Sequence, residues 1–176
     1  MGSIDQLNLI SIDTMRIRKT IDIYFHWKQL DAEVRTLSTR GLNFPAEISE
    51  NLACYACGYL LNKAAGGDAY DPKRNFVIEM KASSSSGPSS FSPVENFDEL
   101  VFIKLNKNED CIYIYNTGVN SQMLKGIKVN ATETVGDKQA KGQRPRFNIE
   151  NAIINPLGLK PTIKFDIRNK EVIKLK

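Results

Sequence analysis

The sequence predicts a mixed α/β protein, with a central mixed sheet of four to five strands, flanking helices and a long helical segment at the N-terminus. Two observations lead to this prediction. Apolar residues recur every three to four positions through residues 4–38 and 44–63, which is the spacing of a helix buried along one face. Runs rich in β-branched and aromatic residues follow at 76–81, 100–105 and 111–116, bounded by turn-forming residues, as expected for strands.

Length and composition favour one soluble domain. The chain has 176 residues, 41% hydrophobic and 25% charged, which are ordinary values for a globular protein with a substantial core. We expect a helical N-terminal segment (1–40), a central core (41–118) and a basic C-terminal segment (119–176). No apolar run is long enough to cross a bilayer, and the N-terminus lacks a signal sequence, so we expect a cytoplasmic protein with no membrane partner.

Cysteine and histidine usage excludes several kinds of site. Three cysteines, an odd number, argue against a disulfide framework. Cys54 and Cys57 form a CxxC motif, but they lie in a helical stretch without a second pair, so we interpret them as helix packing. His26 is the single histidine, which argues against a zinc site and a histidine-based nuclease.

The charge of +4 is unevenly distributed along the chain. Residues 1–119 carry 12 basic and 15 acidic side chains, whereas residues 120–176 carry 12 basic and 5 acidic ones. A basic segment joined to an acidic one that holds candidate metal ligands suits a protein that grips a polyanion and cuts it. The simpler alternative is that the C-terminal lysines are only a solvated surface.

Two helices are expected before the first strong strand. The helix over 4–38 packs either on a partner subunit or on the core of its own chain, and the sequence leaves both open. The helix over 44–63 begins near Pro45, stops at the double glycine 66–67, and is apolar on two sides. Glu50 falls within one apolar stripe, whereas Glu47 lies on the polar edge. A carboxylate among apolar side chains is costly unless something pairs with it.

The residues that follow suggest a metal site. Asp68 follows the double glycine, and the strand 76–81 carries Glu79 and Lys81 two positions apart, hence on one face. Two carboxylates offer the hard oxygen ligands that Mg²⁺ takes, and a lysine beside them could orient or deprotonate water and offset charge on a phosphate. The alternative is an ordinary hairpin whose glutamate and lysine pair on its surface.

The rest of the chain offers candidates for DNA binding. The serine-rich stretch 82–93 leaves the end of the motif strand, and we interpret it as a DNA-facing loop rather than a domain boundary. Residues 120–128 predict a short helix, and residues 149–176 predict terminal strands. Between them lies a polar segment, 130–146. The candidate DNA-binding residues are Ser83, Ser84, Ser85, Lys141, Gln143, Arg144 and Arg146. Arginine and glutamine can read bases, whereas lysine mostly meets phosphates, and phosphate contacts alone remain an alternative.

With these pieces in order, the chain resembles the PD-(D/E)XK type II restriction endonucleases, and more narrowly the small family that cuts GC-N-GC. The resemblance covers nearly the full length. Its motif is Gly67-Asp68, ten residues, then Glu79-Met80-Lys81, with Gly67 in the place of the usual proline. It implies a restriction-endonuclease-like core in which Asp68 and Glu79 hold Mg²⁺, the carbonyl of Met80 assists, and Lys81 acts on the attacking water. It also implies a helix acid near the metal, for which Glu50 fits better than Glu47.

The implied function is Mg²⁺-dependent hydrolysis of double-stranded DNA at a short palindromic site by a homodimer. Two alternatives stay open from the sequence. One is a structure-selective nuclease, such as a junction resolvase, on the same fold. The other is a non-catalytic DNA-binding module in which Glu79 and Lys81 are structural.

Overall fold

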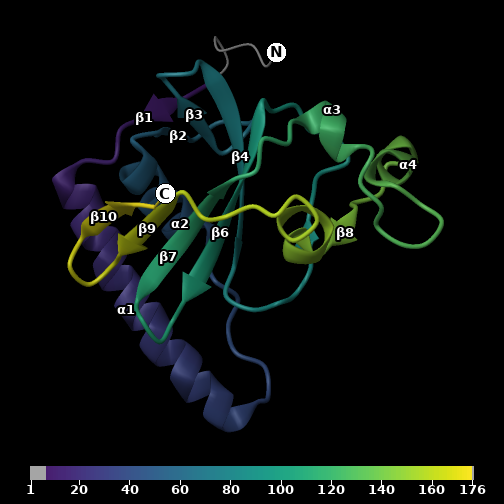
Figure 1. The fold of residues 1–176 in the computed structure, drawn as a ribbon. Helices are drawn as coiled ribbons and strands as arrows, with labels where there is room; N and C mark the ends of the chain where they lie inside the picture. Colours follow the sequence, from purple (N-terminus) through teal and green to yellow (C-terminus); the bar gives the residue numbers. More distant parts are fainter. Residues whose placement is uncertain (1–6, 176) are drawn as a thin grey trace.

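A computed structural model describes residues 7–175 of the chain. Its centre is an eight-stranded sheet in the order β1-β2-β3-β4-β6-β7-β9-β10 (Figure 1). The strands are β1 (Leu9–Ile10), β2 (Leu60–Asn62), β3 (Ala69–Asp71), β4 (Phe76–Ser83), β6 (Glu99–Asn106), β7 (Cys111–Asn116), β9 (Ile163–Asp166) and β10 (Glu171–Lys174). The mixed α/β class is confirmed. The expected four to five strands are too few, because the strands at both edges are only two to four residues long.

The middle of the sheet contains a parallel pair. Strands β4 and β6 run parallel, with Glu79 opposite Leu100 and Lys81 opposite Phe102, whereas the other pairs of this sheet in the described residues are antiparallel. A parallel pair cannot be joined by a hairpin and needs a crossover. The serine-rich stretch after β4 is the start of that crossover, so it leaves the sheet where the motif strand ends.

Two helices pack on one face of the sheet. α1 (Thr14–Leu37) and α2 (Ala46–Cys57) bury their apolar residues against alternate residues of β4, β6 and β7. On β4 these are Ile78 and Met80, so Glu79 and Lys81 face the other way, as the period of a strand requires. The predicted division of this strand into two faces is therefore confirmed.

The ends of both helices differ from the prediction. α1 begins at Thr14, where the side chain of Asp13 caps the helix by accepting a hydrogen bond of 2.7 Å from the amide of Arg16. Of the residues expected to precede Thr14 in this helix, 9–10 form β1 and 4–6 lie outside the described residues. α2 ends at Cys57, because Gly58 adopts a left-handed conformation (φ 72°) that terminates a helix, and residues 60–62 then form β2.

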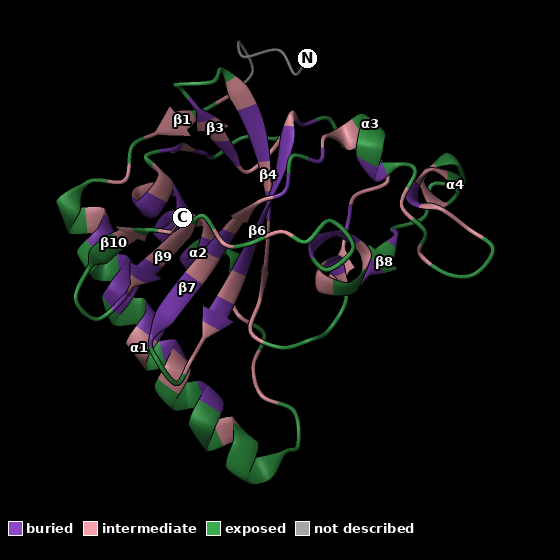
Figure 2. Ribbon diagram, viewed as in Figure 1, coloured by how far each residue is buried: buried purple, intermediate pink, exposed green. Residues whose placement is uncertain are grey.

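A second core lies on the opposite face of the sheet. It joins Val77, Leu100 and Phe102 of the sheet to a lobe built from residues 89–97 and 119–159, and buried residues lie where the lobe meets the sheet (Figure 2). The elements of the lobe are β5 (Ser89–Ser90), α3 (Ser121–Leu124), α4 (Val135–Ala140), β8 (Arg146–Phe147) and a π-helix over Glu150–Ile154. β5 pairs antiparallel with β8 in a separate ribbon. The short helix expected in 120–128 is confirmed, but α4 and the π-helix were missed.

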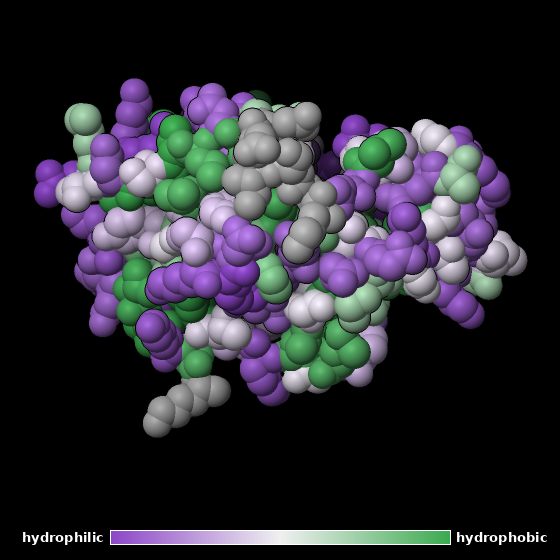
Figure 3. Space-filling view, turned by 90° about the horizontal axis from the view of Figure 1, so that it is seen from above, coloured by the Kyte–Doolittle hydropathy of each residue, from purple (hydrophilic) through white to green (hydrophobic). Residues whose placement is uncertain are grey.

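Seen from above, the part of this lobe that holds α3 and α4 projects from the molecule and exposes many hydrophilic side chains (Figure 3). No helix within residues 7–175 is both long and apolar enough to cross a membrane.

Candidate active site

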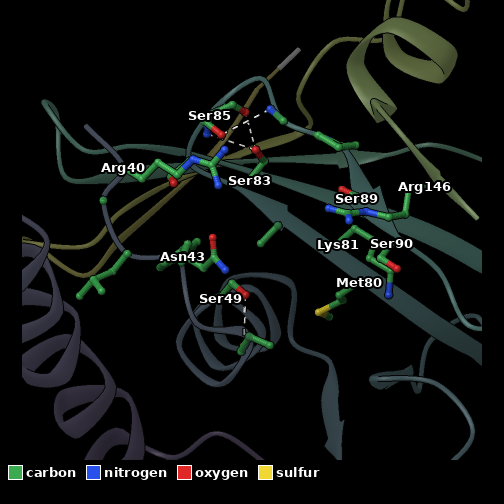
Figure 4. Close-up of a pocket in the computed structure, with 18 of the residues that line it drawn as sticks. Arg40, Asn43, Ser49, Met80, Lys81, Ser83, Ser85, Ser89, Ser90 and Arg146 are labelled. Carbon is green, nitrogen blue, oxygen red and sulfur yellow. Dashed lines mark hydrogen bonds between the residues drawn. The ribbon is translucent and has the colours of Figure 1, made fainter. Parts of the chain in front are cut away.

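A cleft of about 680 Å³ opens beside the end of β4 and the start of α2. Met80 and Lys81 of β4 lie along it (Figure 4). Glu50 of α2 and Asp68 line it as well. Its rim comes from the serine-rich crossover, from Arg146 on β8, and from the loop between α1 and α2. The cleft thus brings together four residues of the predicted site, namely Glu50, Asp68, Met80 and Lys81.

Asp68 is fixed by the neighbouring strand. Its amide donates a hydrogen bond of 2.9 Å to the carbonyl of Ile78, and its Oδ2 accepts one of 2.6 Å from the amide of Met80. The double glycine before it makes this approach possible, since a Cβ on Gly67, which has φ 94°, would lie 2.5 Å from a methyl of Val77. Burial, followed by the charge of Glu79, raises the pKa of Asp68 to about 6.

Glu79 and Lys81 form an ion pair on the face of β4 that carries the second core, with side chains only 13% and 20% exposed. Burial lowers the pKa of Lys81, but the negative charges of Glu79 and Asp68 outweigh this and raise it above its ordinary value. Lys81 is therefore a cation at neutral pH. Glu79 does not line the cleft itself; it contributes charge from beside it.

Glu50 is placed by α2 at the wall of the cleft, whereas Glu47, one turn earlier, is exposed and does not line it. Burial, followed by the charges of Asp68 and Glu47, raises the pKa of Glu50 to about 8. The raised pKa reflects first the removal of this carboxyl group from water and then the negative charges near it. The structure therefore favours Glu50 over Glu47 as the helix acid of the site.

Glu95, which the sequence reasoning missed, joins this group of acids. It lies in the crossover, where its Oε1 accepts a hydrogen bond from the amide of Ser92. Its Oε2 is buried and has no hydrogen-bond partner among the described residues. Burial, followed by the charge of Glu79, raises the pKa of Glu95 to about 7. No motif marks it in the sequence, because only the path of the crossover brings it to the site.

The acids fit a divalent cation by their chemistry. Three carboxyl groups have raised pKa values, and one of them has a buried oxygen without a partner, so positive charge in their midst would relieve an unfavourable arrangement. In residues 7–175, however, no three acidic, histidine or cysteine side chains converge as ready ligands. Glu79 is already paired with Lys81, so its side chain would have to rotate before its carboxylate could act as a metal ligand.

The predicted DNA-binding residues fall into two groups. Ser83, Ser84, Ser85 and Arg146 line the cleft. Lys141, Gln143 and Arg144 do not; they are exposed around the end of α4, and Lys141 pairs with Glu133. The cleft is also lined by Arg40 and Asn43, which precede α2. Both residues were missed in the sequence analysis, because it considered DNA contacts only in the segments that follow the acid motif.

The geometry thus presents a basic lysine and buried carboxylates at the floor of a cleft rimmed by hydroxyl groups and arginines. Comparison with known families agrees: the Bsp6I restriction endonuclease model matches residues 12–156. The chain belongs to the Bsp6I restriction endonuclease family, whose members are site-specific deoxyribonucleases.

Among individual proteins, it is 47% identical over 170 residues to the type II restriction enzyme Bsp6I of Bacillus sp. (strain RFL6), covering 96% of this chain and 98% of that enzyme. The predicted resemblance to type II restriction endonucleases is confirmed. This favours the restriction function over a junction resolvase or a non-catalytic DNA-binding module. Type II restriction enzymes generally use divalent metal ions.

Proposed function

We propose that the cleft is the active centre of a Mg²⁺-dependent type II restriction endonuclease that hydrolyses both strands of DNA at a short palindromic site, GC-N-GC being the proposed sequence. One observation carries the proposal: Glu50, Asp68 and Lys81, from three separate elements, meet in one cleft of a chain that belongs to a restriction endonuclease family. The specific sequence rests on the family resemblance.

The carboxylates of Asp68, Glu79 and Glu50, with the carbonyl of Met80, would hold Mg²⁺. When bound, the ion supplies a Lewis acid for the scissile phosphate. In the metal-free protein the charges of Glu79 and Asp68 raise the pKa of Lys81, so its side chain is an ammonium group that donates hydrogen bonds. From this position its ammonium group orients the attacking water and offsets the negative charge that grows on the phosphate.

We further propose that the enzyme acts as a homodimer and that the whole chain is one nuclease domain. A two-fold symmetric DNA site is matched by two identical subunits, each cutting one strand. Both hydrophobic cores use the same sheet, which supports a single domain. α1 supports a dimer contact, because three large apolar side chains seven residues apart, Ile23, Leu30 and Leu37, are exposed by 45%, 52% and 89%.

The test is digestion of a plasmid of known sequence with Mg²⁺, followed by mapping of the ends, for the wild-type protein and the variants Asp68→Asn and Lys81→Ala. We expect discrete bands from the wild-type protein, no cleavage by either variant, and DNA binding retained by both. Asp22→Asn and Lys19→Ala are matched controls, because both residues are exposed on α1. Undiminished cleavage by Asp68→Asn or Lys81→Ala would refute the site.

A further inference from the structure

The loop between α1 and α2 forms a wall of the cleft that the proposed DNA contacts do not use. Its residues Arg40 and Asn43 line the cleft, as do Ser83 and Ser85 of the crossover. In the close-up, Arg40 extends into the cleft toward Ser83 and Ser85, and Arg146 lies at another side of the same cleft, near Lys81 (Figure 4). Arginines therefore approach the catalytic floor from two separate elements.

The loop is held from beneath by a buried carboxylate. Asp31 of α1 is only 2% exposed, and its Oδ1 accepts a hydrogen bond of 2.7 Å from the amide of Leu42. Its other oxygen pairs with Lys107 at 2.6 Å and with Arg35 at 3.1 Å. These cations compensate the charge of Asp31, so it can stay ionised in a buried position, and the ionised form is the stronger acceptor for the loop amide.

Two further features fix the conformation of the loop. The indole nitrogen of Trp27 donates a hydrogen bond of 3.0 Å to the carbonyl of Asn43. Gly41 passes so close to Asp31 that a Cβ at this position would lie 2.1 Å from its Oδ1. The backbone directly after Arg40 is thus anchored, whereas the side chain of Arg40 is left exposed.

The guanidinium group of Arg40 makes no hydrogen bond or ion pair with any residue in 7–175. The nearby Arg35, in contrast, is paired with Asp31. A fixed backbone that presents an unpaired arginine to a cleft is suited to binding an anion there. In a DNA-cutting enzyme, the abundant anion is the phosphate of the duplex backbone.

We propose that residues 38–43 form a second phosphate-binding site for the DNA duplex, in which Arg40 contacts a backbone phosphate on the side of the cleft away from Arg146. The proposal rests on the proposed nuclease function. It assigns to this loop a role in gripping DNA of any sequence, distinct from the reading of bases. Gly41 and Asp31 act only by positioning the loop.

The test compares wild-type protein, Arg40→Ala, Arg40→Lys and the control Arg18→Ala. Arg18 is also an exposed arginine, on α1, and does not line the cleft, so its variant accounts for the change in net charge. The probes are two fluorescein-labelled duplexes, one with the sequence that the wild-type enzyme cuts and one without it. Affinity is measured by anisotropy in EDTA, which prevents cleavage, over a series of salt concentrations.

We expect Arg40→Ala to weaken binding of both duplexes by roughly tenfold and to reduce the slope of log affinity against log salt by about 0.9, the value of one lost phosphate contact. Arg40→Lys keeps the slope, because lysine retains the charge. An Arg40→Ala slope equal to that of Arg18→Ala overturns the proposal. A loss limited to the cognate duplex, not rescued by lysine, also overturns it in favour of base reading. If Arg40→Ala behaves like Arg18→Ala while Asp68→Asn abolishes cleavage, this inference fails and the nuclease function stands.

Discussion

The ammonium group of Lys81 lies 5.2 Å from the centroid of the Phe91 ring, on which it makes a cation–π contact. The same ring stacks on Phe147, with centroids 4.9 Å apart and an interplanar angle of 4°. Phe147 is adjacent to Arg146 in β8, which pairs with β5 just before Phe91. The position of the lysine at the centre of the cleft therefore depends on the packing of the ribbon that forms its rim.

Replacing Phe91 by leucine should slow cleavage without weakening DNA binding. The change keeps an apolar side chain in the second core but removes the aromatic face from Lys81, a contact worth about 0.5–2 kcal/mol. If that contact acts in the transition state, the single-turnover rate falls by roughly 2- to 30-fold. Phe97→Leu is the matched control, because Phe97 is buried in the same core. Equal rates for the two variants would contradict the role of Phe91.

Replacing Glu50 by glutamine should stabilise the metal-free protein at alkaline pH. The pKa of Glu50 is raised from 4.5 to about 8, so the folded protein binds a proton that the unfolded chain releases between these values. Its contribution to stability is therefore lost as the pH rises from 4.5 through 8. A shift of this size corresponds to roughly 4 kcal/mol at pH 8, so in EDTA at this pH we expect the variant to be more stable by up to that amount. Thermal unfolding would measure this.

The control for that experiment is Glu47→Gln, which changes an exposed glutamate on the same helix. We expect little change in its unfolding temperature. Cleavage with Mg²⁺ should be lost in Glu50→Gln and retained in Glu47→Gln. The reverse result would show that Glu47 is the helix acid that serves the metal.

Replacing Asp110 by asparagine should destabilise the protein at neutral pH. Asp110 is 5% exposed and accepts hydrogen bonds from Tyr24 at 2.9 Å, Lys28 at 2.5 Å and Arg168 at 2.6 Å. Burial raises its pKa, but these partners lower it by more, to below 3.8. Asparagine tolerates the left-handed backbone at this position (φ 49°), so the variant isolates the loss of charge.

We expect Asp110→Asn to unfold about 1–2 kcal/mol more easily at pH 7, because the partly exposed Lys28 and the exposed Arg168 lose the charge of the buried carboxylate. The stabilisation from the wild-type carboxylate is present above pH 3.8 and is lost as the pH falls through its lower folded pKa. Urea titrations at pH 7 and at about pH 3 would show the difference between the proteins shrinking in acid. A difference independent of pH would contradict the assignment.

Replacing Leu30 by glutamate should separate the proposed dimer. Leu30 lies between Ile23 and Leu37 on the exposed side of α1, and a charge at the centre of an apolar contact is costly to bury. Sedimentation should show a monomer, with the free energy of unfolding of the subunit changed by less than roughly 0.5 kcal/mol. Leu157→Glu is the control, because Leu157 is exposed (58%) on a different element. A Leu30 variant that sediments as the wild type does would remove α1 from the interface.

The sequence predicted the structure best where a local pattern corresponds to a single conformation, such as alternation along a strand or a glycine at the end of a helix. The alternation along β4 predicted that Glu79 and Lys81 share a face, and Gly58 carried a visible signal for the end of α2 that the apolar pattern after it obscured. Strands of two or three residues, such as β1 and β2, are too short to show any alternation. They form because the backbones of adjacent strands donate and accept their hydrogen bonds, and the strand propensity of the individual residues does not predict this pairing.

The remaining features depend on contacts between distant residues. Glu95 reaches the acid cluster because the crossover packs Phe91 into the second core. The loop that presents Arg40 is fixed by Asp31, whose partner Lys107 comes from the turn between β6 and β7. Neither relationship has a local signature. The serine-rich stretch, by contrast, was recognisable as a loop at the cleft because it directly follows the motif.

The cleft is assembled from segments that the ribosome makes at different times. Glu79 and Lys81 lie on β4, and Asp68 immediately precedes β3, its hairpin partner, so all three emerge early and close together. The rim of the cleft needs β5 to pair with β8, whose Arg146 is translated much later. A partly synthesised chain thus carries the acids without the ribbon that positions Lys81 and completes the cleft. The cleft is therefore complete only after β8, with Arg146 and Phe147, has been translated and has paired with β5.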